Sequence, residues 1–254
     1  MESAALTRRG LSAGALKVIA ILAMTADHIA WLFFPGYPKE LLPLALHLIG
    51  RITCPIMCFF IAEGFHHTHD VRRYTARLFL FALLSHFAYR FAFQDVTSLR
   101  QLLPFSGGDV LNQTSVIWSL AFGLVMLRIA ADPKRTGAMQ ALLVMLCCAA
   151  ALPADWSCIA ALWILSIGTN RGDGKAQLRW CALYLALYVL VYFLFLDRIY
   201  ALLQCGTLLA VPLLRRYDGT RSHRPAGPAA KWFFYLYYPA HLVLIGLLRP
   251  LVHG

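Results

Sequence analysis

One stretch near the start of the chain limits what the protein can fold into. Residues 16–35, LKVIAILAMTADHIAWLFFP, are apolar and long enough to cross a lipid bilayer, yet they contain Lys17, Asp27 and His28. Ionisable side chains are costly in hydrocarbon, so they usually face the interior of a helix bundle or a wet cavity, where they mark a functional site. Lys17 and His28 fall on nearly one helix face, roughly 16 Å apart along the axis. The alternative is that Lys17 reaches the headgroups and His28 is a hydrogen-bonded core histidine.

The composition extends this conclusion to the whole chain. Of the 254 residues, 60% are hydrophobic and 14% are charged, whereas a soluble domain has roughly 25% charged residues. We therefore predict an all-α, polytopic membrane helix bundle with a single domain over residues 1–254. A net charge of +11 would suggest a nucleic-acid partner for a soluble protein. In a membrane protein it is better explained by cytoplasmic loops, and we expect no nucleic acid.

Hydropathy and loop charge predict the topology. Lysine and arginine are concentrated in every second connection between the apolar segments, which by the positive-inside rule favours about nine transmembrane helices, a cytoplasmic N-terminus and an external C-terminus. The first segment is expected to be an uncleaved span. The connection 94–114 is expected to be external and to form a lid over a site. The predicted segments are 15–34, 44–65, 74–93, 115–131, 138–152, 156–170, 178–196, 199–214 and 232–250.

Polar side chains on three of these segments are expected at a comparable depth. His28, Arg51 and His241 can converge near the membrane centre, with Asp27 beside them. An imidazole with a carboxylate partner is typical of a general base. An arginine at that depth suits a phosphate or a developing oxyanion, and Pro239 leaves a backbone carbonyl without its amide partner. The alternative is an ion-paired polar core without a catalytic role.

Two further groups of residues have more than one interpretation. Glu63-x-x-His66, near the cytoplasmic end of the second segment, resembles half of a di-metal carboxylate site, but such sites need a second copy, so we predict no metal. Asp155, in the turn PADWS, is either the N-cap of the sixth segment or a contact to a substrate.

The chain resembles the TraX family in blocks that occur in the same order: LKVIAILAMTADHIAWLFFP, IGRITCPIMCFFIAEGFHHTHDVRRYTARLFLFALLSH, SVIWSLAFGLVMLR, PADWS and FFYLYYPAHL. It departs from the family pattern at His86, where an acidic residue is expected, and at Ser115, where asparagine is expected. TraX itself is a membrane acetylase of conjugative pilin and acetylates the pilin N-terminus. The wider resemblance is to transmembrane acyltransferases, which take acetyl groups from cytoplasmic acyl-CoA to acceptors at or across the membrane.

The resemblance implies roles for particular residues. Those acyltransferases have an arginine, ten residues and then a histidine; here Lys17 and His28 keep the spacing. His28 thus takes the position of the catalytic base, and Lys17 a supporting or CoA-phosphate-binding position. Around this pair we predict a larger site. Its catalytic residues are His28, Asp27, Arg51 and His241, and its acetyl-CoA-binding residues are Lys17, Glu63, His66, Arg72 and Arg73.

These observations lead to one prediction and two alternatives. The prediction is an acetyltransferase of the bacterial inner membrane that moves an acetyl group from acetyl-CoA to an amine or hydroxyl. The acceptor would be pilin or another envelope protein, a glycan or a lipid. The first alternative is a proton-coupled transporter in which Asp27, His28, Glu63 and His241 relay protons or bind the substrate. The second is a non-catalytic chaperone or assembly factor of the membrane.

Overall fold

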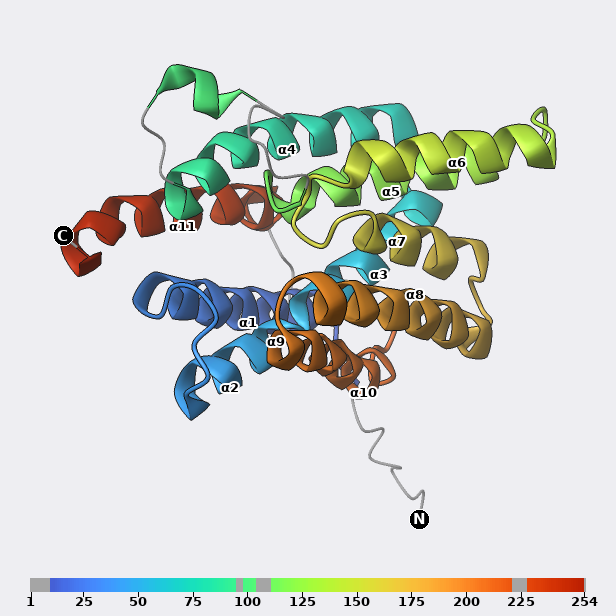
Figure 1. Cartoon of the computed structure of the whole chain (residues 1–254). Helices are drawn as coiled ribbons and strands as arrows, with labels where there is room; N and C mark the ends of the chain where they lie inside the picture. The colour runs from blue at the N-terminus through green and yellow to red at the C-terminus, as the bar shows by residue number, and fades with distance from the viewer. Residues whose placement is uncertain (1–9, 95–97, 104–110, 221–227, 254) are drawn as a thin grey trace, which may run out of the picture.

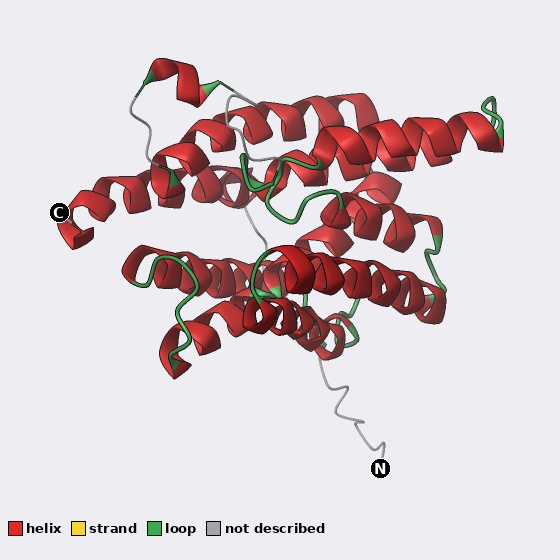
Figure 2. Cartoon of the chain, viewed as in Figure 1, coloured by secondary structure: helices red, strands yellow, loops and turns green. Residues whose placement is uncertain are grey.

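The protein is an arrangement of helices. A computed structural model describes residues 10–94, 98–103, 111–220 and 228–253, and Figures 1 and 2 show that the regular structure of this part is helical. The α-helices are α1 (Ala13–Phe33), α2 (Leu41–Gly50), α3 (Thr53–His67), α4 (Val71–Phe93), α5 (Val116–Ala130), α6 (Gly137–Ala151), α7 (Ile159–Thr169), α8 (Gly174–Phe195), α9 (Arg198–Leu203), α10 (Ala210–Leu214) and α11 (Pro228–His253). Two short 3-10 helices are η1 (Leu99–Leu102) and η2 (Gln204–Leu209).

The predicted all-α class is confirmed, and the chain is a membrane protein. Each apolar segment predicted from hydropathy is helical in the structure. Among the described residues, five helical segments are long and apolar enough to cross a membrane: Ala13–Phe33, Leu41–His67, Val71–Phe93, Gly174–Phe195 and Trp232–His253. The other apolar helical segments are shorter: Val116–Ala130, Gly137–Ala151, Ile159–Thr169 and Arg198–Leu214. The predicted lid, 94–114, lies partly outside the described residues, which omit 95–97 and 104–110, so its role stays a prediction.

Two of the predicted segments are not continuous α-helices. The second breaks between α2 and α3 around Arg51, because Pro55 has no amide hydrogen to donate to the Arg51 carbonyl. The segment 199–214 divides into α9, η2 and α10. Pro212 likewise cannot donate to the carbonyl four residues before it, which prevents a regular α-helix there.

Helix α3 lies at the centre of the arrangement. Figure 1 shows α4, α5, α6 and α11 along one side of the molecule and α1, α8 and α9 along the other, with α3 and α7 between them. The largest apolar core joins α3, α5, α7 and α8 around residues such as Cys58, Leu124 and Ile164. A smaller core joins α1, α4 and α11 around Leu242 and includes Tyr89 and Tyr238.

Contacts between turns place the turns at two ends of the molecule. At the end that holds Lys17, Leu11 pairs with Tyr217 through the backbone, and Arg171 contacts Glu63. At the opposite end, the side chains of Lys39 and Asp197 lie 3.8 Å apart. Thr114 pairs there with Ala154, and His253 contacts the Leu32 carbonyl. We call these the Lys17 end and the Asp155 end.

Candidate active site

Two histidines from α1 and α11 meet in the interior of the protein. The Nδ1 atom of His28 lies 2.6 Å from Nε2 of His241, and the two rings stack with their centroids 4.9 Å apart. Both side chains are buried. On its other nitrogen, Nδ1, His241 lies 2.9 Å from the backbone carbonyl of Tyr237.

These contacts determine which nitrogen of His28 can act as a base. A carbonyl oxygen can only accept, so Nδ1 of His241 carries the hydrogen and Nε2 of the neutral ring accepts. His28 must then donate from Nδ1, which leaves a lone pair on its Nε2. A histidine whose Nδ1 hydrogen is held by a partner and whose Nε2 has a lone pair has the tautomer that a general base requires.

Asp27 belongs to a second group on the neighbouring face of α1. Its carboxylate accepts hydrogen bonds from His47 at 2.8 Å and from the Arg51 guanidinium at 2.7 Å. Arg51 also donates to the His47 carbonyl and to Oε1 of the buried Gln204. We expected Asp27 to orient His28, but the structure gives its hydrogen bonds to His47 and Arg51. The ring of His28 is held by His241 instead, because adjacent residues on a helix point about 100° apart.

The break in the second segment makes room for Asp27. A β-carbon at Gly50, the last residue of α2, would overlap the Asp27 side chain. Glycine at this position therefore allows α2 to approach α1 closely, and the helix ends there so that Arg51 can turn its guanidinium toward the carboxylate. The group around Asp27 therefore depends on the close approach of α2 to α1 and on the break between α2 and α3.

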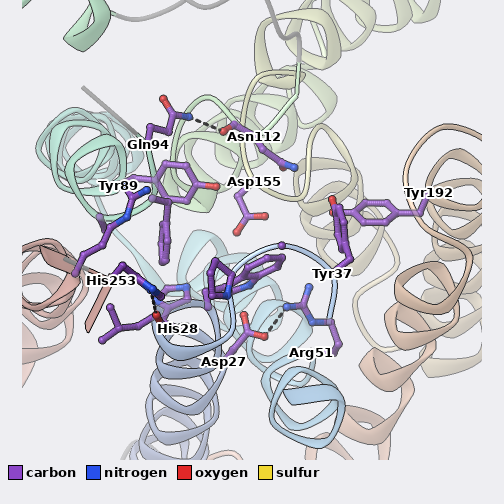
Figure 3. Close-up of a pocket in the computed structure, with 17 residues that line it drawn as sticks. Asp27, His28, Tyr37, Arg51, Tyr89, Gln94, Asn112, Asp155, Tyr192 and His253 are labelled. Atoms are coloured by element: carbon purple, nitrogen blue, oxygen red, sulfur yellow. Dashed lines mark hydrogen bonds and ion pairs between the residues drawn. The ribbon is translucent and has the colours of Figure 1, made fainter. Parts of the chain in front are cut away.

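A cavity of about 420 Å³ lies next to these groups at the Asp155 end of the molecule. Figure 3 shows the carboxylate of Asp155 pointing into it, above Asp27 and Arg51. Its walls combine polar and charged side chains with aromatic rings, and the aromatic lining residues are Trp31, Tyr37, Tyr89, Phe93 and Tyr192. Asp155 does not cap α7, because the residue at the N-cap position is Cys158. Of the two interpretations of Asp155, its position in the cavity fits contact with a substrate.

The match to known proteins now identifies the family. The family described as TraX protein matches residues 12–249. The chain belongs to the TraX family. A probable fimbrial assembly protein, FimC of serogroup H1 from Dichelobacter nodosus, is 29% identical over 243 residues, which cover 92% of this chain and 94% of the relative. A shorter match, 35% over 57 residues, covers 22% of this chain and 21% of an uncharacterised protein of Rickettsia prowazekii. No solved structure matches the chain.

The residues predicted to bind acetyl-CoA lie toward the Lys17 end of this TraX-family protein. The ammonium group of Lys17 lies over the rings of Phe60 and Phe234, 5.2 and 5.6 Å from their centroids. Lys17 therefore makes cation–π contacts with α3 and α11 at this end, and its predicted role in binding acetyl-CoA stays a prediction.

Three of the other predicted acetyl-CoA residues, Glu63, His66 and Arg73, have protein partners at this end. Glu63 accepts two hydrogen bonds from Arg171, at 3.1 and 3.2 Å, and Nε2 of His66 lies 3.0 Å from the Gly168 carbonyl. These contacts join α3 to the end of α7 and the turn before α8. Arg73 forms an ion pair with Asp70, and Arg72 is exposed.

Two buried residues of the candidate site were not predicted from the sequence. His47 is 1% exposed and Gln204 is 2% exposed, and both belong to the group around Asp27 and Arg51. His47 could have been found, because it is an ionisable residue inside the apolar run LLPLALHLIG, the same signal that identifies Asp27. Gln204 could not, since one amide between short helices carries no such signal.

Proposed function

We propose that the protein is an acetyltransferase that moves an acetyl group from acetyl-CoA to an amine or hydroxyl acceptor, with His28 as the general base. The observation that carries this proposal is the chain of contacts from the Tyr237 carbonyl through His241 to His28, beside the cavity. It leaves Nε2 of His28 with a lone pair next to a space that can hold an acceptor. Membership of the TraX family and the predicted match of Lys17 and His28 to the acyltransferase spacing support the same reaction.

The proposed reaction uses the site in two steps. As the acceptor nitrogen or oxygen attacks the thioester carbon, Nε2 of His28 takes its proton. The negative charge of Asp27, on the adjacent residue, favours the imidazolium that forms. When the intermediate collapses, the carbon–sulfur bond breaks and His28 returns the proton to the CoA thiolate. Asp155 is placed to accept a hydrogen bond from the acceptor in the cavity.

We also propose that the chain crosses the bacterial inner membrane nine times, with its N-terminus in the cytoplasm. The separation of turn contacts into two ends supports this topology, as does the concentration of basic residues in every second connection. The Lys17 end would then face the cytoplasm, where acyl-CoA is available, and the cavity would open toward the other side. Donor and acceptor would meet at His28 from opposite sides.

The acceptor that we propose is pilin or another envelope protein. The supporting observation is the long match to a relative whose name describes it as a probable fimbrial assembly protein. A glycan or lipid acceptor would use the same chemistry at His28. The acceptor classes are distinguished by offering each one separately to the purified protein with labelled acetyl-CoA and measuring which one is labelled.

The decisive experiment compares wild type with His28→Ala in nanodiscs supplied with labelled acetyl-CoA and membrane extract as acceptor. We expect label transfer to fall at least about 100-fold in His28→Ala, with the abundance and unfolding temperature of the protein unchanged. His69→Ala, in the exposed turn between α3 and α4, is the matched control and should keep full activity. Full activity in His28→Ala would disprove the base, and substrate flux in liposomes without acyl-CoA would favour transport.

A further inference from the structure

The proposed acetyl transfer needs hydrogen-bond donors for the oxygen of the thioester, and both His241 and Arg51, the arginine considered for this role from the sequence, have other partners. His241 donates from Nδ1 to the Tyr237 carbonyl, and its Nε2 accepts from His28. The Arg51 guanidinium is fixed by Asp27 and Gln204 on the Asp27 face of α1, about 100° around the helix from His28. The donors for the oxyanion must therefore come from another element near His28.

Helix α5 begins close to His28 with polar groups that have no partner. Ser115 is its N-cap residue, but its side chain makes no capping hydrogen bond, and its hydroxyl is buried without a partner. The hydroxyl of Tyr238 is buried and lies within interaction distance of the Ser115 hydroxyl and the amide of Val116, but among the described residues it makes no well-formed hydrogen bond. The ring of Tyr238 packs edge-on against His28 and His241, at centroid distances of 6.2 and 5.3 Å.

Buried polar atoms without a hydrogen-bond partner among the described residues occur at three consecutive positions between the cavity-lining Asn112 and the start of α5. Asn112 lines the cavity, and the three residues that follow it each bury a side-chain oxygen without a partner: Gln113, Thr114 and Ser115. Buried polar groups are nearly always paired, so several unpaired ones in sequence need an explanation. A ligand oxygen that accepts a hydrogen bond would satisfy the hydroxyl of Ser115, the last of the three, whereas the amide oxygen of Gln113 can only accept and is not explained in this way.

The start of a helix suits a developing negative charge. The first amides of an α-helix have no carbonyl partner within the helix, and they form the positive end of its dipole. Here the N-terminus of a 15-residue helix is combined with two buried hydroxyl groups, from Ser115 and Tyr238. Because these donors are fixed before the reaction, they would need no reorganisation as the charge appears.

We propose that the hydroxyls of Tyr238 and Ser115, with the first amide of α5, bind the carbonyl oxygen of the acyl donor and stabilise the oxyanion. This inference rests on the proposed acetyl transfer. When the acceptor lone pair forms its bond to the thioester carbon, the π electron pair of the carbonyl moves to this oxygen, and His28 takes the acceptor proton. When the pair returns, the carbon–sulfur bond breaks and the CoA thiolate leaves with the proton from His28.

The test removes one hydroxyl at a time and keeps the ring or backbone. We expect Tyr238→Phe to lower kcat about 100-fold with little change in KM for acetyl-CoA, because an oxyanion donor acts mainly in the transition state. Ser115→Ala should lower kcat as well, and Ser115→Asn should retain much of it, since the amide can still donate. Tyr184→Phe, in a partly buried tyrosine of α8, is the matched control and should leave kcat unchanged.

A second measurement separates a catalytic role from a structural one. The infrared stretch of the thioester carbonyl, followed with isotope-labelled acetyl-CoA, should shift to lower frequency on binding to wild type and lose that shift in Tyr238→Phe. Normal kcat and an unchanged shift in Tyr238→Phe would overturn the inference, while loss of activity in His28→Ala would leave the proposed function standing. No turnover and no carbonyl shift in wild type would reject both.

Discussion

At the scale of single residues, His241 is the partner that holds the ring of His28, the proposed general base. Its Nε2 accepts the hydrogen from Nδ1 of His28, and so it fixes the tautomer of the base. We expect His241→Phe, which keeps an aromatic ring in the stack, to lower kcat/KM about 10- to 100-fold, less than His28→Ala does. Initial rates with labelled acetyl-CoA measure this difference. Wild-type rates in His241→Phe would show that another group orients His28.

Asp155 gives a second prediction, about pH and stability. Burial raises its pKa to about 6, although the Arg51 guanidinium opposes the rise. The folded pKa thus exceeds the ordinary value of 3.8. The stability that the protonated carboxyl contributes is therefore fully present below pH 3.8, the ordinary pKa, and is lost as the pH rises through about 6, the pKa in the folded protein. Asp155→Asn removes the cost of ionisation, so we expect it to be more stable than wild type by about 3 kcal/mol above pH 7 and equal to it near pH 4.

Thermal unfolding in detergent between pH 4 and pH 8 measures this difference. Glu40→Gln, at an exposed carboxylate, is the control, and its difference from wild type should not change with pH. A constant difference for Asp155→Asn as well would contradict the prediction. Asp155→Asn should also lower the transfer rate. A buried charge that destabilises the folded protein is often kept because activity depends on it.

The ionisable members of the site could be predicted from the sequence, but the hydroxyl groups could not. His28, Arg51 and His241 stand out because each interrupts an apolar run. Tyr238 lies in the run FFYLYYPAHL, where several aromatic residues fit a membrane interface equally well. Its position beside the start of α5 depends on how α11 packs against α4 and α1, and the spacing of residues within one segment does not predict this packing.

At the scale of helices, the close approach of α2 to α1 depends on one glycine. A β-carbon at Gly50 would overlap the side chain of Asp27, which is held by His47 and Arg51 and cannot move aside without losing those bonds. We expect Gly50→Ala to destabilise the protein by about 1–3 kcal/mol and to reduce acetyl transfer. The measurement is thermal unfolding together with the initial rate.

Gly137 provides the matched control. It is the first residue of α6, and no atom lies within 4 Å of the position where a β-carbon would be added. Gly137→Ala should therefore leave both stability and activity close to wild type. If Gly50→Ala behaved in the same way, the contact between α1 and α2 would not constrain the site.

Hydropathy located the helices well because each is a continuous apolar run, whereas the breaks within them needed a different signal. Pro55 and Pro212 mark the irregular regions, since each removes a backbone donor. The functional importance of the first break, however, comes from the meeting of Gly50 with Asp27 on another helix. A contact between two residues that are distant in sequence, such as these, cannot be predicted from the sequence of either segment alone.

At the scale of the whole molecule, the nine-crossing topology makes a prediction that a five-crossing topology does not share. If only the five longest helical segments crossed the membrane, α4 would end outside and the turn 170–173 before α8 would lie outside as well. With nine crossings, α5, α6 and α7 also cross, and this turn lies in the cytoplasm. The contact of Arg171 with Glu63 near the end of α3 favours the second arrangement, because it places both turns at one end.

An epitope inserted after Gly172 tests this difference directly. Gly172 is in a tight turn with a φ of 89°, and space is open around its α-carbon, so an insertion should be tolerated there. We expect antibody to reach this epitope only after the membrane is permeabilised, and to reach one inserted beside Gly36 in intact spheroplasts. Gly36 lies in the turn after α1, on the rim of the cavity. Access to the Gly172 epitope in intact spheroplasts would place Arg171 outside, and the proposed route of acyl-CoA from the Lys17 end to His28 would then be wrong.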